Sequence, residues 1–169
     1  LIGGEHTVTI GAFQALDRQQ ERCGIVQFDA HADLRNTYQD SPFSHACTMR
    51  RALDMGLPIL QIGVRSMSPE EHDLRQNEPS IHSFDAADIA KKGIASLEIP
   101  GTFPRNVYVT FDVDALDPSV MPATGTPEPG GLGWYDVMYA LEKIAAVRNV
   151  IGFDVVELAP IPGLHYPEF

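Results

Sequence analysis

Short apolar and β-branched runs alternate along the chain with segments whose apolar residues recur at helical spacing. The runs predict strands at residues 24–29, 58–64, 80–84, 106–112 and 149–155. The helical spacing predicts helices at residues 7–20, 45–56, 85–97 and 134–147. Ser68-Pro69-Glu70-Glu71 adds the cap, proline and acidic residue of a further helix start. This alternation is typical of βα units, so we expect an α/β fold with a mostly parallel sheet.

Two longer segments carry no such pattern. Residues 34–44 and 115–133 are interrupted by proline or glycine and polar residues, and the second contains ALDPSVMPATGTPEPGG. We expect both to be irregular loops. Because long loops in compact domains are often functional, they are candidates to border a site.

Acidic and histidine side chains follow two of the predicted strands. Asp29, His31 and Asp33 occupy every second position after the run Ile25–Phe28, in GIVQFDAHADLR. Asp112 and Asp114 repeat this spacing at the end of VYVTFDVD. Side chains two residues apart in an extended chain point the same way, so each set can converge if the extended geometry persists beyond the strand.

His6, in GGEHT, follows another probable strand end. Ligands of open α/β sheets bind at the carboxyl ends of the strands, where all three groups would lie. Burying four carboxylates together without cations costs several kcal/mol per charge. Carboxylate and imidazole ligands suit manganese or another first-row divalent ion. Six such ligands, some of them bridging, fit two ions about 3.5 to 4 Å apart.

Composition narrows the choice of partners. The 169 residues include 12 basic and 23 acidic side chains, a formal charge of -11 with no compensating basic run. Nucleic acid and anionic membranes are therefore poor partners. No apolar run is long enough to span a bilayer, and two cysteines make no disulfide framework, so we expect a soluble cytoplasmic protein. The chain lacks an initiator Met and opens on an apparent strand end, so we expect one domain, residues 1–169, truncated at both ends.

Six segments occur in an order that resembles the arginase/agmatinase (ureohydrolase) family: GGEHT, DAHAD, SHACTMRR, FDVDALDPS, TGTPEPGG and GFDVVELAP. The combination of DAHxD with DxDxxDP is highly specific, whereas GGEHT alone is a weak signal. The resemblance implies a three-layer α/β/α fold, two Mn²⁺ ions per subunit, and a homo-oligomer, either a trimer or a hexamer. Family chains are considerably longer, which also suggests that this chain is a fragment.

The resemblance also implies roles for the metal ligands. Asp29 and Asp112 would bridge the ions, His6 and Asp33 would bind one ion, and His31 and Asp114 would bind the other. Glu5 stands where arginases usually have Asp, and this position is not a ligand.

Three further residues match family positions with roles in catalysis or substrate binding. His45 corresponds to a histidine that shuttles a proton, Glu157 to a carboxylate that grips the guanidinium, and Thr126 to a residue lining the guanidinium pocket. Asp114 would also help to handle a proton. Without the resemblance, His45 could be a helix-start histidine, Glu157 a strand-end acid and Thr126 a turn residue. Asp154 is a candidate turn acid or a support for the ligands.

The segment LRNTYQDSPFSHACTMRR resembles the agmatinase branch of the family. The implied reaction is hydrolysis of agmatine, a small cationic guanidino compound, to putrescine and urea. Arg35 could instead meet a substrate carboxylate, as in a guanidinobutyrase, an arginase or a guanidino-acid hydrolase. A dinuclear phosphoesterase would gain from basic residues placed around the phosphate, whereas the proposed pocket offers acidic residues. A non-catalytic metal-binding member of the family also fits the sequence.

Overall fold

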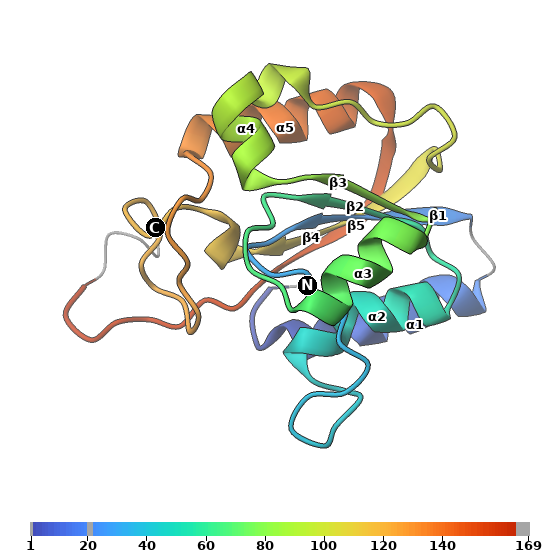
Figure 1. Ribbon diagram of the computed structural model, residues 1–169, viewed down its shortest axis with the longest axis horizontal. Helices are drawn as coiled ribbons and strands as arrows, with labels where there is room; N and C mark the ends of the chain where they lie inside the picture. The colour runs from blue at the N-terminus through green and yellow to red at the C-terminus, as the bar shows by residue number, and fades with distance from the viewer. Residues whose placement is uncertain (1, 20–21, 165–169) are drawn as a thin grey trace.

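The computed structural model describes residues 2–19 and 22–164 of the chain. Its centre is a parallel sheet with the strand order β3-β2-β1-β4-β5 (Figure 1). The strands are β1 (Cys23–Phe28), β2 (Ile59–Ile62), β3 (Ile81–Phe84), β4 (Asn106–Asp112) and β5 (Asn149–Val156). The expected range for β4 matches in full, and the other four differ by one or two residues at one or both ends.

Helices cover both faces of this sheet. One face carries α1 (Thr9–Arg18), α2 (Thr48–Asp54) and α3 (Pro69–Asn77), and the other carries α4 (Ala86–Lys92) and α5 (Trp134–Val147) (Figure 1). The α/β fold with three layers, expected from the sequence, is confirmed. No helix among residues 2–19 and 22–164 is long and apolar enough to cross a membrane.

Three of the expected helices are too long. The segment 85–97 is divided at Gly93, whose φ of 75° lies in the left-handed region and ends α4 before the 3₁₀ turn η3 (Ile94–Ser96). The segments 7–20 and 45–56 begin with the 3₁₀ turns η1 (His6–Val8) and η2 (His45–Cys47). The helix start at Ser68 is confirmed, since Ser68 and Glu71 form a capping box on α3.

The core explains why β1 is apolar at every position except Gln27. All six of its residues are buried, with Ile25 packed in the cluster that includes Phe13 of α1, and Val26 and Phe28 in the cluster that includes Ile144 of α5. A parallel strand covered by helices on both faces has no position that meets solvent. The central strands are therefore rigid supports for whatever follows them.

Strand β5 forms one edge of the sheet, and its Phe153 is 57% exposed. The carboxyl end of β5 is tied to the GGEHT segment, because the Gly3 N–H donates to the Val155 carbonyl at 2.9 Å and the Glu157 N–H donates to the Gly4 carbonyl at 2.9 Å. These bonds place His6 at the end of the sheet where β1 and β4 also terminate.

Candidate metal centre and active site

The site lies where β1 and β4 end side by side. Their parallel register pairs Phe28 with Phe111, so Asp29 and Asp112 leave neighbouring strands at the same level. The chain continues from β1 to β2 on one side, whereas β4 lies on the other side, so the strand order reverses here. Such a reversal opens a crevice at the carboxyl ends of the strands in α/β proteins.

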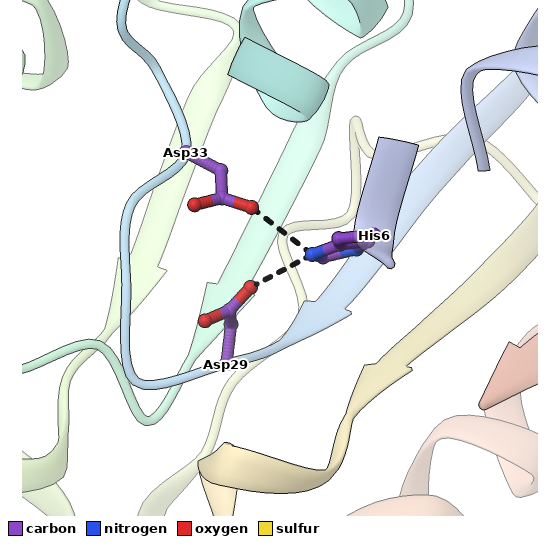
Figure 2. Close-up of side chains that lie close together, drawn as sticks. All are labelled: His6, Asp29 and Asp33. Carbon is purple, nitrogen blue, oxygen red and sulfur yellow. Dashed lines mark ion pairs between the residues drawn. The ribbon is translucent and has the colours of Figure 1, made fainter. Parts of the chain in front are cut away.

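The first group of candidate ligands is His6, Asp29 and Asp33, whose ligand atoms all lie within 4.8 Å of one another. His6 Nδ1 is 3.0 Å from Asp33 Oδ2, 3.3 Å from Asp29 Oδ2 and 3.5 Å from Asp112 Oδ2. Figure 2 shows the Asp29 and Asp33 carboxylates converging on this nitrogen. All four side chains are buried.

The second group is Asp29, His31 and Asp114. His31 Nδ1 lies 3.0 Å from Asp114 Oδ2 and 3.6 Å from Asp29 Oδ1. Asp29 thus turns one oxygen toward each histidine, the arrangement that a bridging carboxylate requires. Asp112 belongs to neither three-residue group found in the described part of the chain, but its Oδ1 accepts a hydrogen bond from the Asp114 N–H at 2.9 Å.

The sequence argument required the chain to stay extended after β1, but the structure is not extended throughout this segment. Asp33 has a φ of 54°, a left-handed conformation that is uncommon for a residue other than glycine. Its neighbours hold it there, since the Leu34 N–H donates to Glu71 Oε1 at 2.9 Å and the Arg50 N–H donates to the Asp33 carbonyl at 3.1 Å. Strained backbone of this kind is concentrated at functional sites in proteins.

Burial and mutual repulsion disturb the ionisation of these carboxylates. Burial, reinforced by the charge of Asp29, raises the pKa of Asp33 to about 7 and also raises the pKa of Asp112. For His31, burial acts in the opposite sense, but Asp114 and Asp29 outweigh it and raise the pKa to about 11. The carboxylates of the cluster therefore strongly favour a cation beside them, whether a protonated histidine or a metal ion.

The donor set fits divalent cations. His6 Nδ1 is fully buried and has no hydrogen-bond partner among the described residues, although three carboxylates face it. Imidazole nitrogen and carboxylate oxygen are the ligands of both groups, which suits manganese and other first-row divalent ions.

A cavity of about 270 Å³ adjoins the cluster. His45, at the start of η2, and Thr126 both line it, together with His31 and Asp33 of the ligand groups. Thr126 Oγ1 donates to Asp114 Oδ2 at 3.2 Å. The structure thus brings His45 and Thr126 to one cavity beside the candidate ligands.

Glu157 lies at the same end of the sheet but does not line this cavity. Its Oε1 accepts a hydrogen bond from the His6 backbone N–H at 2.6 Å, and its φ is 63°. This left-handed conformation turns the chain immediately after β5 and brings the carboxylate against the His6 segment.

Glu5 has a role that sequence reasoning missed. Its Oε1 accepts hydrogen bonds from the His45 N–H at 2.8 Å and from His45 Nδ1 at 3.0 Å. Burial alone would raise the pKa of Glu5, but hydrogen bonds from Thr7 and His45 outweigh it and lower the pKa. Glu5 thus orients the His45 ring through Nδ1, and the other ring nitrogen, Nε2, makes no bond to Glu5.

Two buried glutamines also escaped the sequence analysis. Gln27 of β1 donates to Asp29 Oδ2 at 2.8 Å, and Gln61 of β2 donates to Gln27 Oε1 at 2.6 Å and to the Ala32 carbonyl at 2.8 Å. The two residues are paired in register and fully buried. The sequence did contain a signal for them, since each is a polar residue inside an otherwise apolar strand.

Arg65 joins three segments around the site. Its guanidinium donates to the carbonyls of Gly63, Asp114, Ala115, Leu116 and Glu128 at 2.8 to 3.4 Å. It therefore fastens the segment after β4 to the loop that carries Thr126. Nothing in the sequence near Arg65 indicates this role.

Comparison with known proteins assigns the chain to a family. The chain matches the arginase family over residues 1–164 and belongs to that family, whose members are metal-dependent. The family expected from the six sequence segments is thus confirmed.

Its relatives include the N(1)-aminopropylagmatine ureohydrolase of Synechocystis, 42% identical over 99% of this chain and 55% of the relative. The agmatinase of Pyrococcus horikoshii is 40% identical over 94% of this chain and 53% of the relative. The solved structure of the agmatine ureohydrolase of Thermoplasma volcanium superposes with a TM-score of 0.80 at 38% identity, over 94% of this chain and 53% of that chain. The chain thus spans about half the length of these relatives.

Proposed function

We propose that this protein is a dinuclear manganese ureohydrolase that cleaves agmatine to putrescine and urea. The observation that carries the proposal is the position of Asp29, which is shared by two His/Asp groups beside a cavity lined by His45 and Thr126. Relatives named as ureohydrolases support the reaction class.

The proposed ligands follow the two groups. His6 and Asp33 would hold one ion, His31 and Asp114 would hold the other, and Asp29 and Asp112 would serve both. When bound, two such ions supply hydroxide at neutral pH by lowering the pKa of water. Guanidinium is a poor electrophile because of its resonance, so the protein must also hold its carbon against the nucleophile.

The remaining side chains orient the substrate and move the proton. Glu157 binds the guanidinium through Oε2, while Oε1 stays on the His6 N–H. Thr126 borders the guanidinium through its bond to Asp114. His45, held by Glu5 through Nδ1, delivers a proton from Nε2 to the departing amine.

N(1)-aminopropylagmatine is a second candidate substrate, because several relatives at 38% to 42% identity are named as its ureohydrolases. It would extend beyond the guanidinium along the cavity wall formed by Tyr38, Ser66 and Met67. Arg35 borders the same cavity, and a substrate with a terminal carboxylate would place that group here.

The test is urea release by the Mn²⁺-loaded protein in its native full-length form. Agmatine, N(1)-aminopropylagmatine, arginine and 4-guanidinobutyrate are compared at equal concentration. We expect the highest kcat/KM with agmatine. A preference for another of these guanidines would reassign the specificity, and no urea from any of them would refute the ureohydrolase proposal.

A variant separates catalysis from metal binding. His45→Ala should keep the metal content of the protein while lowering kcat, because the imidazole lines the cavity but belongs to neither ligand group. Unchanged kcat across pH would remove the proton role of His45.

We also propose a homo-oligomer, a trimer or a hexamer, which light scattering of the same preparation tests.

A further inference from the structure

We propose that Thr110, Asp154 and Tyr108 form a buried hydrogen-bond relay that sets the tautomer of His6, keeping a proton on Nε2 and leaving Nδ1 as a metal ligand. The inference rests on the metal centre of the proposed function but concerns residues outside both ligand groups. These three are positioning residues, since they act on the metal site through His6.

The relay crosses from β4 to β5. Thr110 and Asp154 are register partners on these strands, and both are fully buried. Thr110 Oγ1 donates to Asp154 Oδ1 at 2.7 Å, and the Tyr108 hydroxyl donates to Asp154 Oδ2 at 2.9 Å. His6 Nε2 lies 2.9 Å from Thr110 Oγ1. The chain of bonds thus runs from the ligand histidine to a buried carboxylate.

The directions of these bonds follow from counting protons. Both hydroxyls donate to Asp154, Thr110 to Oδ1 and Tyr108 to Oδ2. Burial, together with the charge of Asp154, raises the pKa of Tyr108, which keeps its hydroxyl a donor. Thr110 has a single hydroxyl proton and gives it to Asp154. Its oxygen can then only accept from His6, so Nε2 carries a proton.

The relay opposes the local preference of the ligand cluster. Carboxylate oxygens of Asp29, Asp33 and Asp112 lie 3.0 to 3.5 Å from His6 Nδ1 and would favour a proton on that nitrogen. A neutral imidazole with its proton on Nδ1 could not bind an ion there. By requiring a donor at Nε2, Thr110 reserves the Nδ1 lone pair for the metal. Carboxylate-linked contacts of this kind orient metal-binding histidines in other proteins.

The test is the affinity of the full-length protein for Mn²⁺ alone, measured by calorimetric titration of Thr110→Val and Thr110→Ser. Valine has nearly the shape of threonine but cannot accept a hydrogen bond, so we expect affinity for the ion that His6 would hold to fall by about 10-fold to 100-fold. Serine retains the hydroxyl and should restore affinity to within a few-fold of the parent protein.

Thr9→Val is the matched control. Thr9 is a fully buried threonine close to His6 in the chain, and its hydroxyl has no hydrogen-bond partner among the described residues. This variant should bind Mn²⁺ as the parent does. Equal losses in Thr9→Val and Thr110→Val would overturn the relay, because they would reflect only a disturbed core.

A second measurement needs no substitution. In protein loaded with Zn²⁺ as a diamagnetic substitute, ¹⁵N NMR of the His6 ring should show a protonated Nε2 and a metal-bound Nδ1. A proton on Nδ1 would overturn the inference even if Thr110→Val failed to fold. Because neither readout depends on turnover, a protein that passes both but releases no urea would contradict only the proposed function.

Discussion

Replacement of Asp33 by asparagine should stabilise the metal-free protein at alkaline pH. The carboxyl group is 5% exposed, and burial together with the charge of Asp29 raises its pKa from 3.8 to about 7. At one pKa unit per about 1.4 kcal/mol, ionising this group in the folded protein costs roughly 4 kcal/mol above pH 7. Asparagine has nearly the same shape and carries no charge, so it avoids this cost.

The sign of the effect defines the pH window. Asp33 loses its proton near pH 3.8 in the unfolded chain but only near pH 7 in the folded protein. The stability that the folded protein owes to the protonated Asp33 is therefore fully present below pH 3.8. The contribution is lost progressively as the pH rises through about 7. The difference between Asp33→Asn and the parent protein should therefore be small at pH 4 and reach a few kcal/mol in favour of the variant at pH 8.

Urea unfolding in the presence of a chelator measures this difference at each pH. Asp73→Asn, a change at an exposed position of α3, is the matched control and should leave the free energy of unfolding unchanged. Added Mn²⁺ should reverse the order, stabilising the parent protein more than Asp33→Asn, which lacks a ligand. A variant no more stable than the parent at pH 8 without metal would refute the electrostatic argument.

Three other substitutions test separate parts of the site. Asp29→Ala should remove a ligand from both groups and lower the manganese content to less than one ion per subunit by elemental analysis; retention of two ions would rule out bridging by Asp29. Glu5→Ala should lower kcat by up to about 5-fold, since a hydrogen bond between half-exposed charged side chains contributes up to about 1 kcal/mol, with manganese content unchanged. An unaltered kcat would show that His45 needs no such support. Arg65→Met should lower the free energy of unfolding by about 3 kcal/mol, with partial recovery in Arg65→Lys; equal stability of parent and Arg65→Met in urea would contradict its role as a link between segments.

The strands and the candidate ligands could be predicted because their signals are local. A buried parallel strand is a short apolar run, and the residue after it lies at the carboxyl edge wherever the strand is placed in the sheet. Asp29 and Asp112 could thus be assigned to one region before their pairing was known. The helix predicted at 85–97 was too long because apolar periodicity continues through Gly93, whereas the backbone turns there and ends α4.

The supporting contacts could not be predicted because they join residues far apart in the chain. Glu5 and His45 are 40 positions apart, and Gln27 and Gln61 are 34 apart. Each pair depends on how elements dock or on strand register, which no local pattern specifies. Asp154 could only be classed as a turn acid or a support for the ligands, since its partners Tyr108 and Thr110 are identified by the β4–β5 register.

The pairing of β1 with β4 also determines when during folding the metal site can exist. The Ala30 N–H donates to Asp114 Oδ1 across 84 positions of sequence, with β2, β3 and three helices between them. Contacts of such long range form slowly, because a large loop must close before they are gained. A chain emerging from the ribosome contains His6, Asp29, His31 and Asp33 well before Asp112 and Asp114 are synthesised. Binding of the proposed metal pair would therefore report that β1 and β4 have docked, and the rate at which tight Mn²⁺ binding appears after refolding would measure that step.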